Sequence, residues 1–219
     1  MNIDRLLVVV AHPDDESIMC GGTISKCADK GIPVLVFCMA DGVGSRTGGV
    51  INIDAYRERH GQFRRACKIL GTENAWIRSY HDNQMDKYPL LQVIQDIESH
   101  VQRFNPDTVI THWSHDLNVD HRVVSEATIT ACRPKTGVRN VLLGETLSST
   151  EHAITKKFEP NVFVSIDIEK KLQACSEYID EIKDKQRSIE AIKALSVRRG
   201  SECCTDFAEV FHAYRMYYD

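Results

Sequence analysis

Two short runs of polar side chains carry most of the chemistry that this sequence could perform. The first run is His12-Pro13-Asp14-Asp15-Glu16, and the second extends from His112 to His121 and ends Asn118-Val119-Asp120-His121. The first run sets three carboxyl groups beside one imidazole. Adjacent carboxylates repel one another, so a fold brings them together only where something positive lies among them. The first run therefore predicts a site for a cation.

Helix capping is the alternative explanation for the first run. Asp14 or Asp15 could accept hydrogen bonds from backbone amides at a helix start, and Glu16 is favoured in a first helical turn. Capping accounts for one or two of the acids, but it leaves His12 without a reason. His121 adds a second imidazole near another expected helix start, where a surface histidine is the alternative. Two histidines and one carboxylate are a common ligand set for a divalent metal with an open position.

Alternating apolar and amphipathic segments predict the elements that must position these runs. Continuous apolar, β-branched segments indicate strands buried on both faces, and segments with helical spacing indicate helices between them. The expected strands are Leu6–Val10, Val34–Met39, Ala75–Ile77, Thr108–Thr111, Val141–Leu143 and Val162–Ile166; the expected helices are Glu16–Lys30, Asp54–Leu70, Leu90–Arg103, Asp120–Cys132 and the charged stretch Glu169–Ala194; and Phe207–Met216 is a final short helix or strand. This alternation is typical of an α/β protein with a Rossmann-like layered fold, a mostly parallel sheet and helices on both faces.

Each polar run follows an expected strand, and this placement favours a shared site. Ligands of open parallel sheets bind beyond the carboxyl ends of the strands. The two runs meet there if Leu6–Val10 and Thr108–Thr111 are neighbours, which a doubly wound strand order permits. The chain has no linker rich in proline or glycine and no internal repeat. We therefore expect residues 1–219 to form a single domain.

Composition narrows the class of protein and its partners. The 27 Lys and Arg residues against 31 Asp and Glu residues give a net charge of −4, which argues against a nucleic-acid binder. The longest apolar stretch, Val34 to Ala40, is far too short for a membrane span, and the N-terminal pattern is unlike a secretory signal. The eight cysteines form no CxxC pair, which favours a reducing compartment. We expect a cytoplasmic protein, and the sequence leaves a homo-oligomer open.

The two polar runs resemble the motifs of the LmbE/PIG-L family of zinc-dependent N-deacetylases. The first run, placed after a buried strand, is the specific part of the resemblance, and Asn118-Val119-Asp120-His121-Arg122 is the second part. Weaker similarities in Arg57–Gly71, Ser148–Glu151 and Phe207–Phe211 extend it over nearly the whole chain. The resemblance implies one LmbE/PIG-L-like deacetylase domain that removes an N-acetyl group from a small-molecule amino sugar or amino-sugar conjugate.

The resemblance also implies roles for residues of both runs. His12, Asp15 and His121 would bind one zinc ion, with ferrous iron as the alternative metal. Asp14 would be the general base that takes a proton from the metal-activated water and then passes it to the leaving amine.

One position departs from the family pattern. Many members have a histidine three positions before the third ligand, whereas this chain has Asn118. An amide can donate a hydrogen bond to an oxyanion but cannot titrate. His115 could take over the catalytic role if its loop bends back, and a solvated loop histidine is the alternative. Asp120 could instead orient a neighbouring side chain as a hydrogen-bond acceptor.

Substrate contacts are expected from arginines near the same edge of the sheet. Arg46 and Arg57 could reach a sugar hydroxyl or a phosphate, and solvation is the alternative for both. His112 and Trp113 could line the pocket, since aromatic faces suit sugar rings, whereas a core position is the alternative for Trp113. The stretch Glu169–Ala194 mixes charges of both signs, which is typical of a solvated face.

Two other function classes fit parts of the pattern. Two histidines and one carboxylate also describe the facial triad of non-haem iron oxygenases, but those usually have an all-β double-sheet barrel. A non-catalytic Rossmann-like binding module would use the first run as an anion site at a helix start. Three acids would repel a phosphate there, and the first run lacks GxGxxG.

Overall fold

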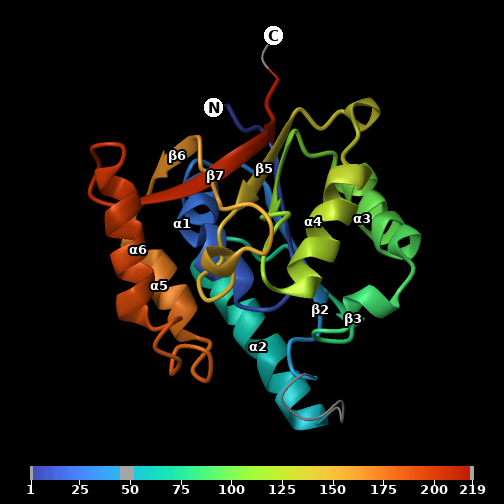
Figure 1. Cartoon of the computed structure of the whole chain (residues 1–219), viewed down its shortest axis with the longest axis horizontal. Coiled ribbons are helices and arrows are strands. Elements are labelled where there is room, and N and C mark those ends of the chain that lie inside the picture. Colours follow the sequence, from blue (N-terminus) through green and yellow to red (C-terminus); the bar gives the residue numbers. More distant parts are fainter. Residues whose placement is uncertain (1, 45–51, 218–219) are drawn as a thin grey trace.

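A seven-stranded sheet forms the centre of the structure, a computed structural model that describes residues 2–44 and 52–217 (Figure 1). The strand order is β3-β2-β1-β4-β5-β7-β6. The pairs among β1 to β5 are parallel, and β7 is antiparallel to both of its neighbours. The strands are β1 (Leu6–Val10), β2 (Val34–Ala40), β3 (Ala75–Tyr80), β4 (Thr108–His112), β5 (Asn140–Gly144), β6 (Val162–Ser165) and β7 (Ala208–Arg215). The predicted mostly parallel α/β sheet is confirmed.

Helices cover both faces of this sheet (Figure 1). The α-helices are α1 (Asp15–Asp29), α2 (Ile53–Ile69), α3 (Leu90–Phe104), α4 (Val119–Ala131), α5 (Ile168–Ser176) and α6 (Ile189–Ser201), and the short 3-10 turns are η2 (Met85–Lys87), η3 (Pro134–Thr136) and η4 (Thr150–His152). Within the described part of the chain, no helix is at once long enough and apolar enough to cross a bilayer.

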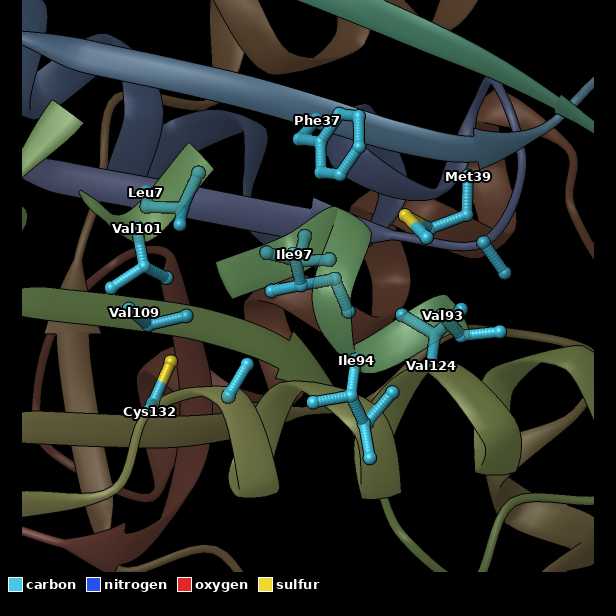
Figure 2. Close-up of a cluster of buried hydrophobic side chains, with 14 of the residues drawn as sticks. Leu7, Phe37, Met39, Val93, Ile94, Ile97, Val101, Val109, Val124 and Cys132 are labelled. Atoms are coloured by element: carbon cyan, nitrogen blue, oxygen red, sulfur yellow. The ribbon is translucent and has the colours of Figure 1, made fainter. Parts of the chain in front are cut away.

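Successive residues of β1 belong to two different cores. Leu7 and Val9 pack with residues of α3 and α4, whereas Leu6, Val8 and Val10 pack with residues of α1, α2 and α5. Side chains of a strand alternate between the two faces of a sheet, so a strand covered on both sides is apolar at every position. Figure 2 shows the first core, in which α3 lies against the sheet. The continuous apolar run 6–10 therefore identifies a central strand.

The prediction of one helical stretch over Glu169–Ala194 is wrong in one respect, because the structure has two helices there. α5 ends at Ser176 and α6 begins at Ile189, and turns and bends occupy residues 177–188, which we call the α5–α6 connection. Ser188 caps α6 by accepting a hydrogen bond from the amide of Ala191 (3.2 Å). Tyr178 in the connection is 1% exposed. The expected solvated face is thus interrupted by a buried segment, because long-range contacts outweigh the local charge pattern.

The helix α1 is broken at Cys20, whose φ of −145° and ψ of 23° are not helical, and a buried carboxylate on β7 binds the backbone just after this break. The oxygens of Glu209 accept hydrogen bonds from the amides of Gly22 (2.8 Å) and Thr23 (2.7 Å) and from the ammonium of Lys171 (2.7 Å). That ammonium also donates to the carbonyl of Ile18 (2.7 Å). In a regular helix the amide of Gly22 would pair with this carbonyl. The Lys171–Glu209 pair therefore bridges the break in α1, whose first residue is Asp15.

We predict that Glu209→Ala lowers the free energy of unfolding by about 3–5 kcal/mol, because it leaves the buried Lys171 ammonium without its counter-charge. Urea denaturation followed by circular dichroism measures this change. Glu126→Ala, at an exposed position in the middle of α4, is the control and should change stability by no more than about 0.5 kcal/mol. Equal effects of the two substitutions would contradict the prediction.

Candidate metal centre

The two polar runs meet beyond the carboxyl ends of β1 and β4. These strands pair directly, with Leu6 opposite Thr108 and Val8 opposite Ile110. His12 comes two residues after β1, Asp15 opens α1, and His121 lies in the first turn of α4. The neighbouring strands therefore bring together side chains that are more than a hundred positions apart in the sequence.

His12, Asp15 and His121 form a compact set of ligand atoms that lie within 4.8 Å of one another. The Asp15 Oδ2 atom is 3.4 Å from His12 Nδ1 and 3.3 Å from His121 Nε2. His121 Nε2 and Asp15 Oδ1 are buried and have no hydrogen-bond partner among the described residues. Burying a polar atom without a partner is unfavourable, and nitrogen and carboxylate ligands bind zinc at about 2.0–2.2 Å. The set therefore fits a single divalent cation.

Two carboxylates fix the other ring nitrogens of these histidines. His12 Nε2 is 3.0 Å from Asp120 Oδ2, and His121 Nδ1 is 3.2 Å from Asp116 Oδ1. A carboxylate accepts a hydrogen bond from the N–H group that faces it, and in a neutral imidazole the opposite ring nitrogen then has a lone pair. Histidines that bind metals generally have such an outer acceptor. This agrees with the expectation that Asp120 orients a neighbouring side chain, whereas the role of Asp116 was missed.

A second cluster shares His12 and consists of His12, Asp82 and Asp120. It uses His12 Nε2, which is also 3.2 Å from Asp82 Oδ1. This nitrogen lies on the opposite edge of the ring from Nδ1, so Asp82 and Asp120 lie beside His12 as outer acceptors of the first set. The amides of Asn83 (2.7 Å) and Met85 (3.0 Å) donate to Asp120 and hold it in place.

The charges of the site favour exchange of protons for a metal ion. Burial opposes protonation of His121, but Asp15 and Asp116 outweigh it and raise the pKa of His121 to about 9. Metal binding to this imidazole therefore displaces a proton, so acid weakens it. Burial, helped by the neighbouring His121, lowers the pKa of His112 to about 3. A neutral His112 stacks on His121, with ring centroids 3.9 Å apart, and accepts a hydrogen bond from the amide of Ala11 (2.9 Å).

His112 and Trp113 are not among the described residues that line the cavity, and Trp113 takes the core position that was the alternative for it. His112 is fully buried behind His121, and Trp113 is a core residue, 2% exposed, whose indole donates to the carbonyl of Lys156 (3.0 Å). β4 extends through His112, so the strand carries this side chain into the interior.

Asp14 lies beside the ligand set with one carboxylate oxygen engaged. Its Oδ2 atom is 3.1 Å from Nη1 of Arg187, and its Oδ1 atom is buried without a partner among the described residues. Burial raises the pKa of Asp14 to about 7, and the charge of Arg187 opposes this rise. The backbone of Asp14 has φ of 123°, a region that residues other than glycine rarely adopt. Its amide donates to Glu16 Oε2 (3.1 Å) within the same turn.

A polar cavity of about 330 Å³ opens over these groups. Three predicted site residues line it: His12, Asp14 and Asn118. Asn118 caps α4 by accepting from the amide of Asp120 (2.8 Å), and its side-chain nitrogen donates to Asn83 (3.2 Å). The other lining residues in the described chain are Pro13, Gly42, Arg59, Asp82, Asn83, Ser148, Glu181, Asp184, Gln186 and Arg187.

The structure does not bring His115 or Arg57 to this cavity. His115 Nδ1 is 2.6 Å from the hydroxyl of Thr155, so its side chain is directed to the neighbouring loop. The Arg57 side chain is 74% exposed and lies 3.8 Å from Asp54, so α2 presents it to solvent. Neither residue is among the described residues that line the cavity. Arg46 lies outside the described residues.

Two cationic side chains that the sequence did not predict reach the cavity. Arg59 on α2 is 6% exposed and pairs with Glu181 at 2.6 Å, and Arg187 comes from the α5–α6 connection. The spacing of α2 could have indicated a buried Arg59, because Arg59 lies four residues before the buried Phe63 on one helix face. No local signal distinguishes Arg187 from its charged neighbours.

The strand order and the cluster of histidines and carboxylates define a layered α/β protein with a candidate metal centre at the carboxyl ends of its central strands. The chain belongs to the PIG-L (LmbE-like) family, since the family described as PIG-L: GlcNAc-PI de-N-acetylase matches residues 7–132. The resemblance of the two polar runs to the motifs of the LmbE/PIG-L family is thereby confirmed as family membership.

Three similar proteins illustrate this relationship. A probable N-acetyl-alpha-D-glucosaminyl L-malate deacetylase 2 of Bacillus cereus is 33% identical over 133 residues, which cover 58% of this chain and 60% of that relative. An N,N'-diacetylchitobiose deacetylase structure from Pyrococcus horikoshii has a TM-score of 0.78 at 20% identity, covering 98% of this chain and 85% of that one. GalB, a 4-carboxy-2-hydroxymuconate hydratase from Pseudomonas putida KT2440, has a TM-score of 0.76 at 18% identity and 98% coverage of both chains.

We predict that zinc at a hundred times its dissociation constant raises the free energy of unfolding by about 2.7 kcal/mol, because the ligand atoms converge only in the folded chain. His121→Ala should abolish this increase. Denaturation with and without zinc, together with metal analysis, measures the effect. His152→Ala, at an exposed position away from the cavity, is the control and should keep the full increase. Equal stabilisation of both variants would contradict the assigned ligand.

Proposed function

We propose that the protein is a metal-dependent hydrolase that removes an N-acetyl group from an amino sugar or amino-sugar conjugate. The unpaired Oδ1 atom of Asp14, a buried residue that lines the cavity with the assigned ligand His12 and precedes the assigned ligand Asp15, is the observation that carries this proposal. It leaves one carboxylate oxygen free to handle a proton next to a cation. Family membership supports amide hydrolysis, and the Bacillus cereus relative bears the name of an amino-sugar deacetylase.

His12, Asp15 and His121 would hold the metal, which we propose is zinc, with ferrous iron as the alternative. A divalent ion with an open position lowers the pKa of a bound water towards about 7 and polarises an amide carbonyl. Asp120 and Asp116 would keep the two imidazoles in the tautomers that present lone pairs to the cation.

Asp14 would move the proton of the reaction. Its Oδ1 atom would accept a proton from water as the water oxygen bonds to the amide carbon, and would return it to the nitrogen as the carbon–nitrogen bond breaks. Acetate and a free amine are the products. Burial raises the pKa of Asp14 above its usual range, which favours a carboxyl group that both accepts and returns a proton. The side-chain nitrogen of Asn118, at the cavity wall, could donate a hydrogen bond to the carbonyl oxygen as it gains charge.

The fold alone does not decide this reaction, since GalB is a hydratase with a similar fold. The reaction classes differ in their products. A deacetylase releases acetate and an amine, a hydratase adds water without cleavage, and an oxygenase consumes oxygen. The most direct experiment is an acetate-release screen over N-acetylglucosamine, N,N'-diacetylchitobiose, nucleotide-linked N-acetyl sugars and N-acetylglucosaminyl malate. The cytoplasmic location and the single domain stay predictions.

We predict that dialysis against a strong chelator abolishes acetate release and that one equivalent of zinc restores it. The physical reason is that a carboxylate alone is a weak base for water, whereas a divalent cation lowers the pKa of the attacking water and polarises the amide carbonyl. Acetate is measured enzymatically, with metal content determined in parallel. Undiminished turnover in protein freed of metal would rule out a metal-dependent mechanism.

Asp14→Asn should reduce turnover by about 100- to 10,000-fold, because an amide cannot accept the proton of water. The variant should still bind one metal ion per chain, since Asp14 is outside the assigned ligand set. Steady-state kinetics and elemental analysis check the two expectations. Glu126→Gln is the matched carboxylate-to-amide control on the surface. Wild-type turnover in the Asp14 variant would remove this residue from the mechanism.

A further inference from the structure

Arg187 approaches Asp14 from a segment far away in the sequence. Its Nη1 atom lies 3.1 Å from Asp14 Oδ2, and its Nε atom donates to the hydroxyl of Ser148 at 2.5 Å. Nη1 is also 3.6 Å from Glu181 Oε2. The Arg187 side chain is 20% exposed and that of Asp14 is 4% exposed. Contacts with three residues, Asp14, Ser148 and Glu181, thus hold the guanidinium at the cavity wall.

The α5–α6 connection is itself tied to the floor of the site. The Tyr178 hydroxyl donates to Glu16 Oε1 at 2.7 Å, and the other oxygen of Glu16 accepts from the amide of Asp14. The Oε1 atom of Glu181 accepts a hydrogen bond from Nη2 of Arg59 on α2 (2.6 Å). These buried contacts determine where the connection lies, and through it where Arg187 lies.

A carboxylate is planar, so holding one of its oxygens largely determines the direction of the other. Arg187 engages Asp14 Oδ2, and Oδ1 is the buried oxygen that has no partner in the described chain. The unusual backbone of Asp14, with φ of 123°, brings the side chain to this place. Strained backbone of this kind persists only where surrounding contacts hold it.

We propose that Arg187 is the positioning residue for Asp14: by binding Oδ2 it directs Oδ1 towards the ligand atoms of Asp15 and His121. The proposal rests on the proposed function, in which Oδ1 handles the proton. Arg187 itself transfers no proton and forms no bond to the acetyl group. Its contribution is geometric, and a displacement of about 1 Å at a reacting group can reduce a rate by about 100-fold.

The test compares Arg187→Ala and Arg187→Lys with Arg198→Ala in the metal-loaded protein. Arg198 is the matched control because its side chain is 71% exposed and pairs with Glu202 on the surface. For each protein, kcat and KM are measured for the best substrate of the acetate-release screen, both with and without added guanidinium ion. The metal content of each protein is determined in parallel.

A positioning role predicts that Arg187→Ala lowers kcat by about 100-fold, keeps KM within about threefold and retains one metal ion per chain. Arg187→Lys should retain more turnover than the alanine variant, and guanidinium should restore part of the activity of Arg187→Ala but none to Asp14→Asn. A structural role would not give this rescue.

Three outcomes would overturn the positioning role while leaving the proposed function intact. They are a kcat of Arg187→Ala close to that of the wild type, a rise in KM alone, which would indicate substrate binding, and a loss of metal, which would indicate support of the ligand set. If neither the wild type nor Arg198→Ala releases acetate from any substrate in the screen, the proposed function fails, and the role of Arg187 fails with it.

Discussion

The structure depends on the burial of several carboxylates within one small region at the end of β1 and β4. Asp14, Asp15, Asp116 and Asp120 are each at most 3% exposed. Buried carboxylates repel one another and need compensating charge or hydrogen bonds. Backbone amides, hydroxyl groups, imidazoles and Arg187 provide part of this compensation. Among the described residues, Asp14 Oδ1 and Asp15 Oδ1 stay buried without a hydrogen-bond partner, and the ligand atoms of His12, Asp15 and His121 lie within 4.8 Å of one another, so a cation can supply the missing compensation.

Contacts behind the assigned ligands hold the two histidines in defined orientations. Asp120 faces one nitrogen of His12, Asp116 faces one nitrogen of His121, and the neutral His112 supports the face of the second imidazole. Each contact restricts a ring to one tautomer or one orientation. A binding site whose side chains are ordered in advance loses less conformational entropy when its ligand arrives. The candidate metal centre is therefore built from two layers of side chains.

The membership of a family and the reaction of a protein are separate conclusions. The sheet and helices of this chain resemble those of a diacetylchitobiose deacetylase and also those of a hydratase, with similar TM-scores. A layered α/β sheet supplies strand ends at which different side chains can be placed. In this chain the walls of the cavity, to which the α5–α6 connection contributes, are where chemical specificity can differ.

Local patterns in the sequence are enough to predict the central strands and the two polar runs at their ends, because burial on both faces and helix starts leave such patterns. The sequence left β7 open between helix and strand, and it misassigned Glu169–Ala194 as one solvated helix. The packing of distant segments brings Arg187 to Asp14 across 173 positions and Asp116 to His121. It also leaves His115 and Arg57 away from the cavity. The physical reason is that charge pairs between distant segments depend on how helices pack over the sheet. The short-range periodicity of the sequence does not predict that packing.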